Sequence, residues 1–347
     1  MRSQTGAVGV QSTTAGDPGL AQRIPATGAE GVARSGRALR TSPARSPRPS
    51  SSPSRPRRGA RPQGWLFSLP ALVLVATFGL LPILVALVVS VTDLDIGGLA
   101  HPGTVQFIGA HNYVRLLADP DFLAACVLTA AYVLVGVPLI TVLSLAVATG
   151  LNRSDGWFFR FLRTMYFLPA VTALVAISVI WKYLYNGQYG VLNWALSSIG
   201  LPELAWLSDP TTARIAVGVV AVWRAIGFNA IILLAAIQGV PPEHLEAASL
   251  DGAGPVRRYV YVVLPQIRFA VGFVVMTTMI AWLQFFDEPF VLTDGGPVGA
   301  TTSVSIFLFK QGFRLNEFGY ASAGSVVLLC SIALITLLQL RMRRADA

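Results

Sequence analysis

One short stretch at the end of an apolar segment carries side chains suited to binding a solute. Gln284, Asp287 and Glu288 are spaced i, i+3 and i+4, so a continuous helix would place them on one face. The aromatic residues beside them are Trp282, Phe285 and Phe286. Carboxylate and amide oxygens accept hydrogen bonds from hydroxyl groups, and aromatic rings pack against the C–H faces of sugar rings. The stretch therefore predicts contacts to a polyhydroxylated solute, with a polar and aromatic membrane boundary as the alternative.

A second candidate is a cation inside a different apolar segment. Arg224 lies about ten residues into that segment, which corresponds to roughly 15 Å of helix and a position near the centre of a bilayer. A charge at that depth is costly, so we expect it to face a partner or a water-filled passage. The alternative is a structural ion pair or a hydrogen bond to backbone carbonyls. Asn229, on the same segment, is a weaker passage candidate.

The sequence offers no set of residues for catalysis. Its two lysines, Lys182 and Lys310, do not follow the glycine-rich loop that cradles nucleotide phosphates. The three histidines, His101, His111 and His244, lack metal-ligand spacing. We therefore expect no enzyme activity, no metal site and no bound cofactor.

Composition indicates a membrane protein. Hydrophobic residues make up 54% of the chain and charged residues 12%, and the mean hydropathy is +0.61. The net charge of +9 lies in residues 1–62, which hold 11 arginines against Asp17 and Glu30, so the rest is neutral overall. This distribution argues against a nucleic-acid partner. Cys126 and Cys330 both fall in apolar segments, where inert thiols are the expectation.

The first 62 residues are rich in Arg, Ser, Pro, Gly and Ala and have almost no large apolar side chains. Such a segment is predicted to be a disordered, basic, cytoplasmic tail close to anionic lipid. Arg57 and Arg58 are similar to a twin-arginine signal, but the apolar run that follows is too long and lacks a cleavage site. A start codon assigned too early is a further alternative. Residues 63–347 are predicted to form the membrane domain.

Long apolar runs with few charges predict six membrane spans. Their expected bounds are Trp65–Thr92, Phe122–Thr149, Thr164–Trp181, Ile215–Gln238, Phe269–Phe286 and Tyr320–Leu340. The connecting segments alternate in basic content: one set, which includes both termini, holds 20 Lys and Arg, and the other holds 5. The richer set should face the cytoplasm, which places both termini and residues 239–268 there.

The segment 243–265 is a polar connection that also predicts ordered helix. Pro241 and Pro242 suit a helix start, Gly252 suits the residue after a helix end, and Pro255 opens a second helix that Pro265 closes. The alternative is a surface helix that contacts no other protein.

These residues carry a resemblance to a known family. The segment resembles the EAA loop of the membrane subunits of bacterial ABC importers, through Glu246, Ala247, Ala248, Asp251, Gly252, Ala253, Leu264 and Pro265. Tyr259 and the closing Leu-Pro make it similar to the carbohydrate branch, the maltose and glycerol-phosphate permease family. Segments 107–117 (FIGAHNYVRLL) and 286–297 (FDEPFVLTDGGP) resemble the same family.

The resemblance implies an all-α membrane protein with the type I importer permease fold. Spans two to six, about residues 122–341, would form its core, and span one would pack outside it. The segment 243–265 would be the coupling helix that docks on an ATP-binding subunit dimer. Further implied partners are a second, homologous permease, an extracytoplasmic solute-binding protein, membrane lipid and a sugar-like solute, in a bacterial cell membrane.

Two alternatives remain open. One is an ABC permease for another solute class, such as an anionic phosphodiester, because Arg224 is a buried cation. The other is a secondary transporter or channel without a motor. That class predicts paired interrupted helices or inverted repeats, which the sequence does not show, and it leaves residues 243–265 unexplained.

Overall fold

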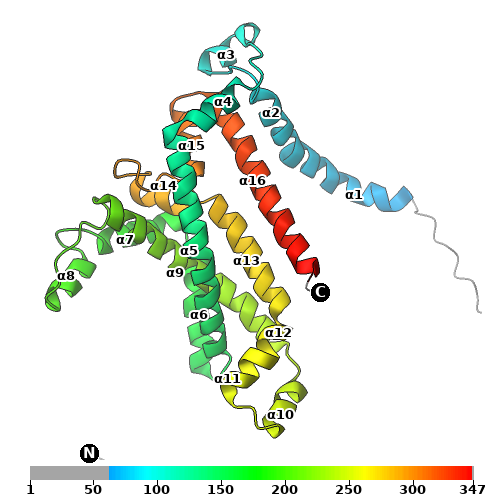
Figure 1. The fold of residues 1–347 in the computed structure, drawn as a ribbon, viewed down its shortest axis with the longest axis vertical. Coiled ribbons are helices and arrows are strands. Elements are labelled where there is room, and N and C mark those ends of the chain that lie inside the picture. Colours follow the sequence, from blue (N-terminus) through cyan, green and yellow to red (C-terminus); the bar gives the residue numbers. More distant parts are fainter. Residues whose placement is uncertain (1–61, 346–347) are drawn as a thin grey trace, which may run out of the picture. The chain divides into compact units, whose positions relative to one another are not determined.

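The computed structural model describes the backbone of residues 62–345 and the side chains of residues 68–342. The predicted tail, residues 1–62, therefore lies outside the described side chains. The described chain is helical, and its only strand-like feature is an isolated antiparallel bridge between Thr92 and Phe107. Figure 1 shows the arrangement of the helices.

The first span consists of α1 (Pro62–Val75), a π-helical turn (Ala76–Leu80) and α2 (Leu81–Val89). The window of its apolar part, Ser68–Val89, has a mean hydropathy of 2.9, and none of it is buried inside the chain. Only α2 packs on another span, α16 (Phe318–Ala345). The first span therefore lies outside the core, as expected.

Two Asp-Pro pairs begin the two longest helices, α5 (Pro120–Leu151) and α9 (Pro210–Gln238). The Asp119 carboxylate accepts hydrogen bonds from the first backbone N–H groups of α5, and Asp209 does the same for α9. Proline at the first helical position has no N–H to leave unsatisfied. These caps start the helices two and five residues before the predicted spans.

The predicted third span, Thr164–Trp181, is sharply bent. The segment is divided into α6 (Trp157–Val171) and α7 (Leu174–Leu184), which meet at 99°. Thr172 and Ala173 between them adopt extended backbone, with ψ of 142° and 124°. Pro169 in the last turn of α6 removes a helical N–H donor, which weakens the helix where it turns. Residues 157–163, expected as loop, belong to α6.

The fifth span is also shorter than expected. It comprises α13 (Arg268–Leu283), which follows the short helical segments of residues 255–266 at an angle of 69°. Those segments are α11 (Pro255–Arg258), a π turn (Tyr259–Val263) and α12 (Leu264–Gln266). Within residues 62–345, four helices are long and apolar enough to span alone, or six elements if each bent pair counts as one span, so the predicted architecture of six spans is confirmed.

Short helices connect the spans. They are α3 (Ile96–Ala100), a 3-10 turn (Pro102–Thr104), α4 (His111–Ala118), α8 (Val191–Ser198), α10 (Pro242–Leu250), α14 (Asp287–Thr293), α15 (Val304–Phe309) and a π turn (Lys310–Arg314). In Figure 1, α10 and α11 lie at the opposite end of α13 from α14 and α15. One apolar cluster on α5, α7 and α9 surrounds Trp282 and Phe285, and another joins α5 and α9 to the segment around α10.

Candidate functional site: a polar cavity and a helical loop

A cavity of about 300 Å³ lies between α6, α9, α13 and α14. Small side chains leave the space open, and polar and aromatic side chains line it. Its lining residues are Ala170, Ala221, Arg224, Ala225, Phe228, Asn229, Thr277, Thr278, Ala281, Trp282, Phe285 and Glu288. We call it the polar cavity.

An ion pair joins two of the predicted passage residues. The Nε and one terminal nitrogen of Arg224 donate to the same carboxylate oxygen of Glu288, at 2.7 and 2.6 Å. The Glu288 side chain is 4% exposed and that of Arg224 is 30% exposed. The pair brings together α9 and α14, and both of its members line the cavity. Arg224 therefore has a partner, and that partner is Glu288.

Asn229 supplies the second polar group, one helical turn further along α9. Its amide nitrogen donates to the Ala225 carbonyl at 3.1 Å and, at a longer 3.4 Å, to the hydroxyl of Thr278 on α13. Asn229 and Thr278 are 6% and 5% exposed. The amide oxygen of Asn229 and the Thr278 hydroxyl proton are groups of the kind that bind a solute hydroxyl.

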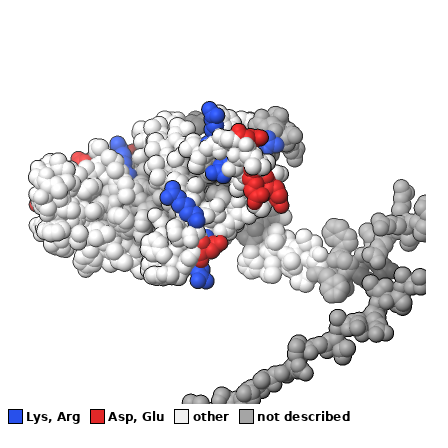
Figure 2. All heavy atoms as spheres, turned by 90° about the horizontal axis from the view of Figure 1, so that it is seen from below, with Lys and Arg blue, Asp and Glu red and all other residues white. Residues whose placement is uncertain are grey.

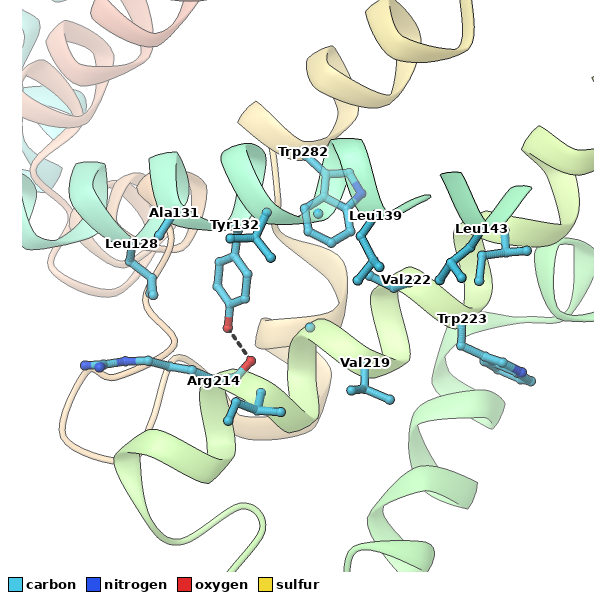
Figure 3. A pocket seen from close by; sticks show the side chains of 15 residues that line it. Leu128, Ala131, Tyr132, Leu139, Leu143, Arg214, Val219, Val222, Trp223 and Trp282 are labelled. Atoms are coloured by element: carbon cyan, nitrogen blue, oxygen red, sulfur yellow. Dashed lines mark hydrogen bonds between the residues drawn. The ribbon is translucent and has the colours of Figure 1, made fainter. Parts of the chain in front are cut away.

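Two stacked aromatic rings form one wall of the cavity. The rings of Trp282 and Phe285 are 5.2 Å apart and 3° from parallel. The indole lies directly over Gly136 of α5, where an added Cβ would come within 1.9 Å of the ring. Trp282 also lines an apolar groove on the far side, between α5 and α9 (Figure 3). One indole therefore separates the polar cavity from that groove.

Gln284 and Asp287 do not join Glu288 on one helix face. The helix α13 ends at Leu283, Gln284 is its C-cap residue, and α14 begins at Asp287. Both side chains are exposed and neither lines the polar cavity. Phe286 stacks on Phe290 instead, at 4.8 Å. The break in the helix invalidates the spacing argument, which assumed that α13 continues to Glu288.

Further residues that line the cavity were not predicted from the sequence. Thr277 and Thr278 are adjacent polar residues inside an apolar span, and this was the available signal. Phe228 and Ala170 carried no sequence signal that would mark them as lining residues, because aromatic and small residues are common in membrane spans. Close packing of α6 on α9 brings Ala170 there: an added Cβ at Gly227 would lie 1.8 Å from a backbone oxygen of α6.

The loop after α14 is held by a second ion pair. Both terminal nitrogens of Arg314 donate to the Asp294 carboxylate, at 2.8 and 2.9 Å. The hydrogen bond from Arg314 holds the pKa of Asp294 below its usual value. The guanidinium also lies over the rings of Phe290 and Phe309, with centroids 6.0 and 5.8 Å away.

The predicted helix–turn–helix of residues 243–265 is present. The helix α10 ends at Leu250, and Gly252 has φ of +75°, the left-handed conformation expected there. The Ala253 N–H donates to the Ala248 carbonyl at 2.9 Å, and the Gly252 N–H donates to the Ser249 carbonyl at 3.1 Å. These two bonds define a Schellman motif, which satisfies carbonyls at the end of α10.

The inner side of this loop is anchored, whereas its outer side is unpartnered in the single chain. Leu245 packs against the cluster of α5 and α9, and the Tyr259 hydroxyl receives a hydrogen bond from Thr149 at 2.8 Å. The large apolar side chains on the outer side are Leu250, Val256 and Tyr261, exposed by 90%, 76% and 76%. Figure 2, which views the molecule from below Figure 1, shows acidic and basic side chains interspersed on this face.

The helical membrane architecture, the polar cavity between spans and the exposed helical loop together define a transporter permease subunit. Residues 122–345 match the family of the binding-protein-dependent transport system inner membrane component. The chain belongs to this family. It is therefore the transmembrane permease subunit of an ABC importer, and it is embedded in a membrane.

Several relatives match along most of the chain. The lactose transport system permease protein of Rhizobium radiobacter is 34% identical, covering 80% of this chain and 92% of the relative. The trehalose/maltose transport system permease protein of Thermococcus litoralis is 32% identical, covering 81% and 93%. The sn-glycerol-3-phosphate transport system permease protein of Yersinia pestis is 32% identical, covering 84% and 97%.

A solved structure shares the fold. A chain of the bacterial alginate ABC transporter, crystallised with an alginate pentasaccharide-bound periplasmic protein, superposes with a TM-score of 0.69. The match covers 82% of this chain and 96% of that chain, at 23% identity. The likeness supports the type I importer fold.

Proposed function

We propose that this chain imports a sugar or sugar-like solute, and that the polar cavity lies on the solute's path. The observation that carries the proposal is the combination of an amide, hydroxyl groups and stacked aromatic rings around a cavity of about 300 Å³. Polar groups at Asn229 and Thr278 match solute hydroxyls, and the Trp282–Phe285 wall matches the C–H face of a sugar ring. Names of relatives that include lactose and trehalose/maltose support this solute class.

The cavity is tested by removing one hydroxyl. Thr278→Val keeps the shape of the side chain but deprives Asn229 and the solute of a partner, so uptake of radiolabelled disaccharide should fall. Thr141→Val is the matched control: Thr141 is buried in α5, bonds only its own helix and lines no part of the polar cavity. If the two variants are present in the membrane in equal amounts and take up disaccharide equally, the cavity does not lie on the solute path.

A second candidate solute is an anionic phosphodiester or phosphate ester. It is favoured by the similarity to the sn-glycerol-3-phosphate permease of Yersinia pestis. The ion pair argues against it, because Glu288 already neutralises Arg224. A competition assay separates the two: sn-glycerol-3-phosphate should leave disaccharide uptake unchanged, and strong inhibition would favour the anionic solute.

The energy for transport is proposed to come from separate ATP-binding subunits that dock on α10. The support is an ordered helix whose neighbourhood exposes Leu250, Val256 and Tyr261 without a partner in the single chain. The proposed assembly adds a second permease, which is a homologue or another copy, and an extracytoplasmic binding protein. The chain itself would bind no cofactor and catalyse no reaction. Uptake that continued without ATP would instead favour a secondary transporter.

The proposed orientation places α10 and both termini in the cytoplasm, in a bacterial inner membrane. It rests on the excess of Lys and Arg in the segments on that side. A single cysteine at Ser249 should react only from the cytoplasm, and one at Leu207 only from outside. Labelling of both positions from one side would contradict this orientation.

A further inference from the structure

The apolar groove between α5 and α9 has no assigned role. Its volume is about 570 Å³, and aliphatic and aromatic side chains line nearly all of it (Figure 3). It opens on a different face of α9 from the polar cavity: Gly218, Val219 and Val222 line the groove, whereas Arg224 and Phe228 line the cavity. The groove is therefore a separate site.

One end of the groove adjoins a second, charged cavity. This cavity, of about 490 Å³, lies between the first turns of α5 and α9, the loop of residues 298–302 and the α15 segment. Leu128 and Arg214 line both spaces, so the two adjoin at these side chains. In Figure 3 the Arg214 guanidinium lies beyond Tyr132 at one end, and Trp223 marks the other end.

The charged cavity has an excess of positive charge. Arg214 is fixed by a hydrogen bond from its Nε to the Ala300 carbonyl, at 3.0 Å. Within residues 68–342 no protein acceptor is bonded to its two terminal nitrogens or to the ammonium group of Lys310, which also lines the cavity. Asp121 is the one carboxylate among the lining residues. Two cations against one carboxylate favour an anionic ligand.

We propose that the groove binds a phospholipid with an anionic head group. One acyl chain lies between α5 and α9, and the phosphate faces Arg214 and Lys310 at the membrane boundary opposite α10. Charge and shape together select this occupant: a long apolar groove that ends in fixed cations complements an amphiphile with a negative head. Arg214 lies in the first turn of α9, the depth at which head groups meet a span.

The test uses the full chain in its native membranes, with the subunits that copurify. A phosphatidylglycerol carrying a photoreactive group in one acyl chain is incorporated, irradiated and mapped by mass spectrometry. Crosslinks should concentrate on peptides that line the groove in α5 and α9. A phosphatidylcholine probe with the same acyl chain should label these peptides less. Arg214→Gln and Lys310→Gln should each lower labelling by phosphatidylglycerol about fivefold.

A pair of adjacent alanines tests the groove itself. Ala131 and Ala130 are both exposed on α5, but only Ala131 lines the groove. Ala131→Trp should fill the groove and abolish the selective crosslinks, whereas Ala130→Trp should leave them unchanged. Equal labelling by the two lipids would overturn the proposal, as would labelling that is insensitive to the cation variants. Lipid crosslinks that fall on a second permease chain in place of the groove peptides would show that protein covers the groove and would also overturn it.

Discussion

Replacing Gly252 with valine changes the backbone energy of one turn and little else. Gly252 has φ of +75°, and no heavy atom lies within 4 Å of the position where a Cβ would be added. A new side chain therefore meets open space, and the whole effect comes from forcing a β-branched residue into the left-handed conformation. That strain is about 1–3 kcal/mol.

The strain acts on the Schellman turn between α10 and α11. A penalty of 1–3 kcal/mol lowers the population of the native turn about 5- to 150-fold relative to alternative backbones. The spans are specified by their own hydrophobicity, so Gly252→Val should insert at normal levels while α10 is misdirected. Gly254→Val is the matched control, because Gly254 also has open space around its Cβ position but has φ of −67°, which valine adopts freely.

The assay is ATP hydrolysis by the assembled importer in proteoliposomes, with and without solute-loaded binding protein. Gly252→Val should lose most of the stimulation and retain less of the ATP-binding subunit on copurification, while Gly254→Val behaves as the parent chain. Equal stimulation in both variants would refute the reasoning that the geometry of this turn transmits the motor's movement.

Three further predictions follow from ion pairs and close contacts. Arg224→Met should lower the free energy of unfolding by about 3 kcal/mol in denaturant titrations, because it leaves the buried Glu288 carboxylate without a partner. The double variant with Glu288→Met should recover most of that stability, and additive losses of stability in the double variant would contradict the coupling of the two residues. Because Arg314 depresses the pKa of Asp294, its stabilisation of the loop is present above the usual carboxyl pKa and is lost as pH falls through the folded value. The protection factors of the loop amides against hydrogen exchange should therefore be constant from pH 5 to 8 and fall in strong acid, and a fall near neutrality would contradict this assignment. Gly227→Ala would place a methyl carbon 1.8 Å from a backbone oxygen of α6, so α6 and α9 must separate and the melting temperature should fall; an unchanged value would mean that the contact is loose.

The sequence predicted those parts of the fold that depend on local signals. Uncharged apolar runs predicted the spans. Pro242, Gly252 and Pro255 predicted the helix–turn–helix, including the left-handed conformation of Gly252. These features follow from hydrophobicity and backbone sterics within a few residues. The bend of 99° after Val171 was not predicted, since a proline inside a span often leaves it straight enough to continue.

The polar cavity was predicted only in part, because its members come from different helices. Arg224 was predicted as a cation at a costly depth, and Asn229 and Glu288 were passage candidates beside it; each of the three lines the cavity. Gln284 and Asp287 were included by a helical spacing that the break after Leu283 removes. The pairing of Arg224 with Glu288 spans 64 positions, and nothing in single-sequence spacing specifies such a contact.

The indole of Trp282 forms a partition one side chain thick. It faces the polar cavity on one side and the apolar groove on the other, and Gly136 leaves no room for it to withdraw toward α5. A rigid ring cannot be compressed, so it can yield only by rotating about its own side-chain bonds, and the stacked Phe285 opposes that rotation. The separation of the polar cavity from the apolar groove at this point therefore depends on the orientation of one side chain, because Trp282 is the residue that lines both spaces.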